Sequence, residues 1–192
     1  MSSVIGHILT GATIALPKRQ PASWGWMAWL LALACFPDIE YLALWFFGSN
    51  FPVRLTHSLF VCALLPTATC VWLRRCRPQQ EHGPRTIQAF AAGWSHPLLD
   101  LLTGVSALPL LWPFSNSAFR LPFGILPSAG QLSLSNGYLY RNLGIELGIL
   151  APLCSLLLFQ SAIRRHPRRR WIFAGHLVVL LPCLLWGMAL QR

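Results

Sequence analysis

Six long apolar stretches recur along the chain, and they constrain its fold more than any other feature. A helix needs about 20 apolar residues to cross the hydrocarbon core of a bilayer, with a range of about 17–25. The pattern therefore predicts an all-α, polytopic transmembrane helical bundle of about five or six membrane segments. The stretches are roughly Val4–Leu16, Trp24–Phe47, His57–Leu73, Thr86–Thr103, Leu143–Ile163 and Trp171–Leu190.

The composition agrees with this prediction. Of the 192 residues, 55% are hydrophobic and 10% are charged, and the mean hydropathy is +0.53. Soluble domains carry about 25% charged residues, so this chain has too few to cover a surface that faces water. No long linker divides the sequence, and residues 1–192 are expected to form a single integral membrane domain.

Two of the apolar stretches depart from a simple span. Val4–Leu16 is short, which predicts a tilted or re-entrant helix whose ends are covered by other helices. The second stretch contains Pro37, followed closely by Asp38 and Glu40. Because proline breaks or kinks a helix, we expect a break beside these two carboxylates.

The basic residues predict the orientation of the segments. The formal net charge is +10, and Lys and Arg cluster in alternate loops at Lys18–Arg19, Arg74–Arg85 and Arg164–Arg170. Such clusters mark cytoplasmic loops and favour contact with anionic lipid headgroups, not with nucleic acid.

This orientation places residues 104–142, which are rich in Pro, Gly, Ser and aromatics, on the outer side of the membrane. This segment is too long for an ordinary connection and is expected to be an extracytoplasmic interfacial loop that caps a site.

Ionisable side chains inside a membrane are costly, so each is a functional candidate. The predicted topology places five such residues in the outward parts of their segments, and it places Glu40 and Glu146 on the same side. In contrast, His82 and His166 fall in basic loops, and His176 falls in the inward half of the last segment. Random positions would be divided between the two leaflets, so the sequence predicts a shared polar site at the outer leaflet. The residues predicted to lie in the outward parts of their segments are His7, Asp38, His57, His96 and Asp100.

Three imidazoles and two carboxylates suit a transition-metal ion, with Zn²⁺ favoured over Mn²⁺ and Fe²⁺. His96 and Asp100 are four residues apart and would project from one helical face. The predicted ligands, which would hold one ion with an open position or two ions, are His7, Asp38, His57, His96 and Asp100. Other uses stay open: hydrogen bonds between helices, a helix cap at Asp38, an Arg partner for Asp100, or a proton relay.

A metal-activated water at this site would make the chain a hydrolase. Glu40 or Glu146 would act as a general base or orient a ligand. Arg54, three residues before His57, would bind an anionic group of the substrate, or it anchors the chain at the headgroups. Access from the outer leaflet predicts an amphiphilic substrate, such as a lipid or a lipid-linked phosphate or ester. The alternatives are a transporter or channel with a polar or metal-binding site, and a non-catalytic scaffold.

Four short motifs occur in an order that resembles a known family. The sequence between Gly6 and Asp100 resembles the YdjM-like family of LexA-regulated inner-membrane proteins, described as metal-dependent hydrolases. The resemblance implies a multi-pass protein of the bacterial inner membrane, whose outer side is the periplasm. Glu40 stands where the family often has Asp, so position 40 either ligates the metal or supports a ligand. The motifs are Gly6-His7, Pro37-Asp38-Ile39-Glu40, Arg54-Leu55-Thr56-His57-Ser58 and Ser95-His96-Pro97-Leu98-Leu99-Asp100.

Overall fold

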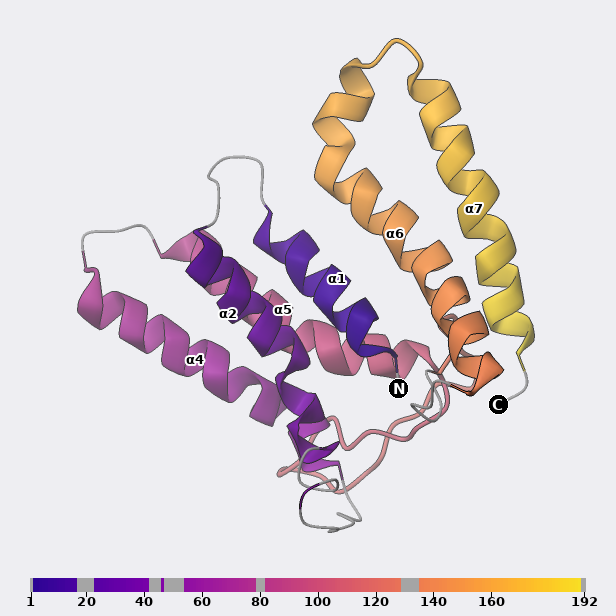
Figure 1. The fold of residues 1–192 in the computed structure, drawn as a ribbon. Helices are drawn as coiled ribbons and strands as arrows, with labels where there is room; N and C mark the ends of the chain where they lie inside the picture. Colours follow the sequence, from indigo (N-terminus) through magenta and orange to yellow (C-terminus); the bar gives the residue numbers. More distant parts are fainter. Residues whose placement is uncertain are drawn as a thin grey trace.

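The computed structural model describes residues 2–16, 23–41, 46, 54–78, 82–128 and 135–190, so Lys18 and Arg19 lie outside the described residues. Over these ranges the fold is helical, with one isolated β-bridge between Leu108 and Phe119 (Figure 1). This confirms the predicted all-α class. The helices are α1 (Val4–Ala15), α2 (Trp24–Cys35), α4 (Leu59–Cys76), α5 (Gly83–Leu102), α6 (Gly137–Arg165) and α7 (Arg169–Ala189), with 3₁₀ turns η1 (Phe36–Asp38) and η2 (Leu55–His57).

Polar residues fix where four of the helices begin. The side chains of Ser3, Ser23, Ser58 and Asn136 accept hydrogen bonds from backbone N–H groups in the first turns of α1, α2, α4 and α6. Such caps satisfy N–H groups that have no partner inside the helix. The break expected near Pro37 is present, because α2 ends at Cys35 and the chain continues into η1.

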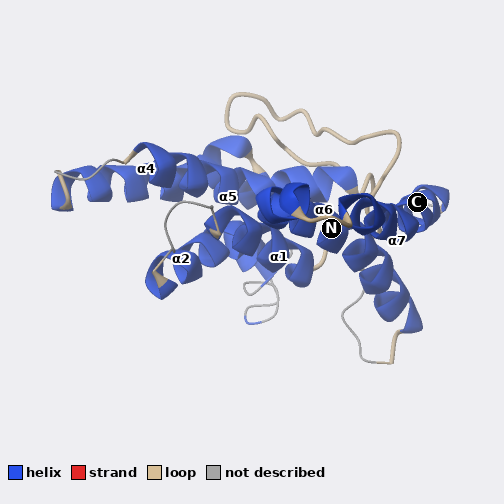
Figure 2. Ribbon diagram, turned by 90° about the horizontal axis from the view of Figure 1, so that it is seen from above, coloured by secondary structure: helices blue, strands red, loops and turns tan. Residues whose placement is uncertain are grey.

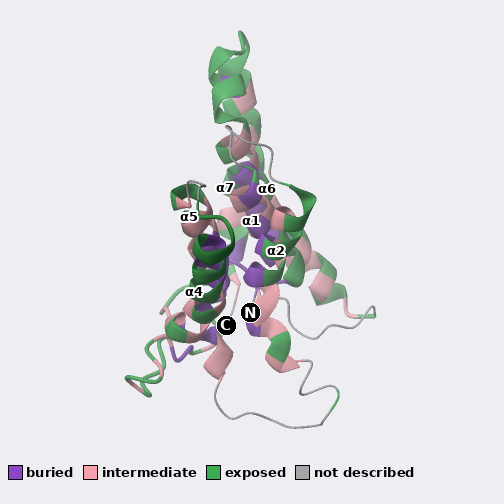
Figure 3. Cartoon of the chain, turned by 90° about the vertical axis from the view of Figure 1, so that its left-hand side faces the viewer, coloured by how far each residue is buried: buried purple, intermediate pink, exposed green. Residues whose placement is uncertain are grey.

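α4 lies at one end of the molecule and the α6–α7 hairpin at the other, with α1, α2 and α5 packed together between them (Figure 2). The short α1 is central, because it packs against α2, α5 and α6. An apolar cluster joins α1, α2 and α5, whereas the far end of the α6–α7 hairpin is largely exposed (Figure 3). We call this cluster the apolar plug; its buried members are Ala15, Leu30, Leu33, Ala89 and Ala92.

Among the described residues, three helices are long and apolar enough to cross a bilayer by length and composition, namely α4, α6 and α7, and α1 is a shorter apolar helix. Their surfaces expose large apolar side chains, among them Trp72 at 56%, Leu157 at 66% and Val178 at 72%. Soluble proteins rarely expose so many large apolar side chains along one helix to water, so these faces suit hydrocarbon.

A glycine sets the distance between α4 and α5. A Cβ atom at Gly93 would lie 2.7 Å from the backbone oxygen of Cys62 and 2.9 Å from Cγ of Pro66. Any larger residue would therefore push the two helices apart. Since His96 is about one helical turn after Gly93, this contact also fixes how far His96 lies from η2, which precedes α4.

Of the predicted cap, residues 104–142, the stretch 104–128 returns along the end of the molecule where η1 and η2 lie (Figures 1 and 2). Residues 137–142 are not loop but the start of α6. The backbone N–H of Leu59 donates to Leu110, and that of Ile125 donates to Leu102. Leu108 is fully buried. This segment is thus packed on the ends of α4 and α5, while its location at a membrane interface stays a prediction.

Candidate metal centre

Four segments bring the five predicted metal ligands together at one end of the molecule. They come from α1, η1, η2 and α5. Asp38 is 19% exposed at its side chain, whereas the other four are fully buried. The five residues are His7, Asp38, His57, His96 and Asp100.

Four atoms of this group form a closed ring, which we call the acceptor ring: Oδ1 of Asp38, Oδ2 of Asp100, and Nε2 of His57 and His96. The Nε2 atom of His57 lies 3.4 Å from Asp100 Oδ2 and 4.0 Å from Asp38 Oδ1. The Nε2 atom of His96 lies 3.4 Å from Asp38 Oδ1 and 3.8 Å from Asp100 Oδ2. All four atoms are buried and lack a hydrogen-bond partner among the described residues.

Neighbouring groups identify the lone pairs of both imidazoles. The Nδ1 atom of His96 lies 2.7 Å from the backbone oxygen of Ala34, so this nitrogen donates and Nε2 carries the lone pair. The hydroxyl of Thr56 donates to the backbone oxygen of Pro37, so it can only accept from His57 Nδ1 at 3.3 Å. His57 therefore also turns the lone pair of Nε2 into the ring.

Four acceptors that face one another without a donor repel, and a cation bound between them would relieve this repulsion. Distances of 3.4–4.0 Å exceed the approximately 2.7–2.9 Å of charge-assisted N–H···O bonds. Zinc bonds of about 2.0–2.2 Å in tetrahedral geometry place neighbouring ligand atoms about 3.3–3.6 Å apart. The acceptor ring is slightly wider than a zinc site, and its residue types fit the ion.

His7 lies against this ring. Its imidazole stacks on that of His96, with centroids 3.7 Å apart and planes 8° apart. The hydroxyl of Ser2 donates to Asp100 Oδ1 and lies 2.8 Å from His7 Nε2. His7 also offers a ligand atom within 4.8 Å of those of Asp38 and His96.

Two overlapping triads could hold an ion: His7 with Asp38 and His96, and His57 with His96 and Asp100. They share His96, whose Nδ1 is occupied by Ala34. One lone pair binds one ion, so the geometry favours a single ion over two.

Glu40 lies behind the imidazole of His57. Its Oε1 accepts a hydrogen bond of 2.7 Å from the backbone N–H of Thr56, and its Oε2 lies 3.7 Å from Nδ1 of His57. A carboxylate behind an imidazole fixes the orientation of that ligand and makes it more basic. Of the two roles open to position 40, support of His57 is the one this geometry favours.

Glu146 and Arg54 occupy different places. Glu146 is 1% exposed, and both of its oxygens accept from the backbone N–H of Ser3. It therefore ties the start of α1 to α6 and belongs to neither metal-binding triad. Arg54 precedes η2, and its Nη1 is buried without a hydrogen-bond partner among the described residues.

The other histidines lie outside this centre. His176 joins α7 to α6 through a contact of 2.6 Å between its Nε2 and the hydroxyl of Ser155. His82 immediately precedes α5 without a capping hydrogen bond from its side chain, and His166 follows the last turn of α6. None of them belongs to a group of potential metal ligands among the described residues.

Sequence reasoning placed Thr56 in a motif with His57 but gave it no supporting role, and it did not identify Ser2. Thr56 stands beside His57, and its position next to a candidate ligand was an available signal. Ser2 donates its backbone N–H to Asp100 across 98 positions of sequence. No local pattern marks a contact between residues so far apart.

Comparison with known proteins extends the similarity beyond these motifs. The family described as YdjM inner membrane protein matches residues 1–191, so the match continues through α6 and α7. No curated protein and no solved structure matches the chain. The chain belongs to the YdjM inner membrane protein family.

Proposed function

We propose that this membrane protein is a metal-dependent hydrolase with one divalent ion bound by Asp38, His57, His96 and Asp100. The observation that carries the proposal is the acceptor ring, in which four buried ligand atoms face one another without a donor. Two imidazoles and two carboxylates suit Zn²⁺, with Mn²⁺ or Fe²⁺ as alternatives. A bound ion of this kind polarises a substrate oxygen and lowers the pKa of a bound water to about 7.

The partly exposed residues mark the side from which a substrate would reach the ring. The side chains of Asp38 and Glu40 are 19% and 16% exposed, whereas His57, His96 and Asp100 are fully buried. Of the two predicted bases, Glu40 is better placed than Glu146 to exchange a proton with a water on this side. Its carboxylate would orient His57 and accept that proton.

The position of Arg54 is evidence for an anionic substrate. Its Nη1 is buried and without a hydrogen-bond partner in the described chain, which is costly unless a ligand completes it. The guanidinium precedes η2, the turn that carries His57. An arginine at this place would bind a phosphate or carboxylate group and hold the adjacent ester bond near the ion.

The distribution of charge supports a site at the periplasmic side of a multi-pass protein. The last turns of α4 and α6 carry Arg74, Arg75, Arg164 and Arg165, and the metal ligands lie near the opposite ends of the helices. Basic residues favour the cytoplasm. The exposed apolar faces beside the site suit a lipid or a lipid-linked phosphate or ester as the substrate.

A transporter would need polar groups that continue across the membrane. Between α1, α2 and α5, the described residues instead place the apolar plug on the basic side of the metal ligands. The plug leaves a site that opens toward one side only. This arrangement favours a hydrolase over a transporter that moves a solute across the membrane.

The test is hydrolysis by purified protein in mixed micelles. A panel of lipid phosphates, lipid-linked diphosphates and lipid esters would be assayed with Zn²⁺-loaded protein and with protein stripped by EDTA. We expect release of product only from the loaded protein, and its loss in His96→Gln. His176→Gln is the matched control and should keep full activity, because His176 lies outside the centre. Metal-loaded protein that cleaves no member of the panel, or equal activity in His96→Gln, would contradict the proposal.

A further inference from the structure

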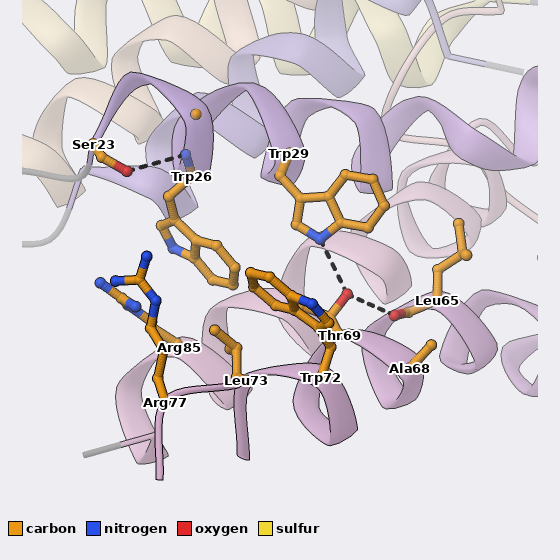
Figure 4. A pocket seen from close by; sticks show the side chains of 11 residues that line it. Ser23, Trp26, Trp29, Leu65, Ala68, Thr69, Trp72, Leu73, Arg77 and Arg85 are labelled. Carbon is orange, nitrogen blue, oxygen red and sulfur yellow. Dashed lines mark hydrogen bonds between the residues drawn. The ribbon is translucent and has the colours of Figure 1, made fainter. Parts of the chain in front are cut away.

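A groove lies between α2 and α4, close to the start of α5 (Figure 4), and none of the five candidate metal ligands lines it. Its volume is about 610 Å³, within the range of about 300–1,000 Å³ that is usual for ligand sites. Ser23 and Arg77 lie at the ends of helices, so the groove reaches the level where the helices leave the apolar layer.

Three tryptophans form the walls of this groove, which we call the tryptophan groove: Trp26, Trp29 and Trp72. The indole N–H of Trp29 donates to Thr69, and that of Trp26 donates to Gln88. Both polar atoms are therefore satisfied by the protein, and the ring faces are left for apolar contact. Trp29 and Trp72 remain 39% and 56% exposed.

One end of the groove is strongly basic. Arg77 and Arg85 lie together there, beside Trp26, whereas Leu65 and Ala68 lie at the other end (Figure 4). The guanidinium of Arg85 is 5.7 Å from the ring centroid of Trp26, a cation–π contact that orients it. The lining residues include two positive side chains and no carboxylate.

We propose that the tryptophan groove binds an anionic phospholipid of the adjacent leaflet. Arg77 and Arg85 bind its phosphate, and one acyl chain lies along Trp29, Trp72 and Leu65. The amphipathic shape selects this occupant, because a free phosphate would leave the apolar walls empty. The choline group of a zwitterionic lipid would bring a further positive charge beside Arg77 and Arg85. Nothing in the proposal depends on hydrolysis at the metal centre.

The test is native mass spectrometry of the full chain in mixed micelles that contain equal amounts of phosphatidylglycerol and phosphatidylcholine. We expect phosphatidylglycerol to be retained preferentially. Arg77→Gln/Arg85→Gln should lower this preference by up to about 25-fold, since each basic residue near a membrane surface favours anionic lipid by about fivefold. Arg164→Gln/Arg165→Gln removes the same charge from the end of α6 and should leave the preference unchanged.

Single variants separate the two ends of the groove. Arg77→Gln changes an exposed residue and is expected to reduce the preference while the protein stays folded. Trp72→Ala should reduce retention of the lipid, and Trp171→Ala, which alters an exposed tryptophan elsewhere, should not. The proposal is overturned by an equal loss in the Arg164/Arg165 control, by retention without preference in the unmodified chain, or by glycerol 3-phosphate binding as tightly as the lipid.

Discussion

The substitution Asp100→Asn distinguishes two interpretations of the cluster: an empty metal site, and a network of ion pairs between protonated histidines and carboxylates. In the unmodified chain, Asp100 Oδ1 accepts from the backbone N–H of Ser2, and Oδ2 faces the lone pairs of His57 and His96. Asparagine can keep the first contact and place its NH₂ group where Oδ2 stands. The amide would then donate to the imidazoles, and the repulsion within the acceptor ring would be relieved.

The magnitude follows from the groups that gain partners. A buried polar atom without a partner costs about 1–3 kcal/mol, so metal-free Asp100→Asn should be more stable than the metal-free unmodified chain by about that amount. For a chain of about this size, 1 kcal/mol shifts the unfolding temperature by about 2–4 °C, which gives about 2–12 °C. Metal at 100 times its Kd should stabilise the unmodified chain by about 2.7 kcal/mol and should leave Asp100→Asn unchanged.

The assay is thermal unfolding in detergent, followed by tryptophan fluorescence, with EDTA or with saturating Zn²⁺. Asp38→Asn should act in the same direction but less strongly, because Asp38 is partly exposed. If protonated histidines paired with Asp100 instead, the substitution would break ion pairs. A lower unfolding temperature for Asp100→Asn in EDTA would refute the reasoning.

Three further substitutions test the surroundings of the site. Glu40→Gln should weaken metal binding about 10–100-fold in a competition assay with a chelating dye, because the carboxylate behind His57 is lost; unchanged affinity would exclude that support. Arg54→Gln should raise KM for an anionic substrate about tenfold or more with the metal content unchanged, and a fall in kcat alone would contradict the binding role. Gly93→Ala should cost about 1–3 kcal/mol in chemical unfolding, since its Cβ would meet Cys62, whereas Gly175→Ala, with open space around it, should not destabilise the chain.

Most of the helices could be predicted from hydropathy, because a segment that crosses a bilayer must be both apolar and helical. The apolar stretch at Leu143–Ile163 lies within α6, which extends to Gly137 and Arg165. The predicted helix ends were less accurate than the predicted helices. Capping residues such as Asn136 and Ser58 determine where a helix begins, and a hydropathy pattern does not detect them. The stretch that began at His57 shows this, because His57 belongs to a 3₁₀ turn and α4 starts after Ser58.

The members of the site could be predicted, but their roles could not. Burying an ionisable group is costly, so His96 and Asp100 stand out in an apolar segment. Whether a residue binds the ion or supports a ligand depends on differences in position of less than 1 Å. Glu40 and Asp38 are two residues apart, yet Asp38 faces both ring imidazoles and Glu40 stands behind His57. Glu146 was a candidate base from sequence, and its contact with Ser3 spans 143 positions.

The central claim is that Asp38, His57, His96 and Asp100 bind one divalent ion. The most direct measurement is the metal content of the purified chain by mass spectrometry after loading with Zn²⁺ and removal of unbound ion, with anomalous scattering to locate the ion. The account predicts one ion per chain within the acceptor ring, and none in His57→Gln or His96→Gln. Retention of the ion by both variants, or an ion located at His82, His166 or His176 instead, would contradict it.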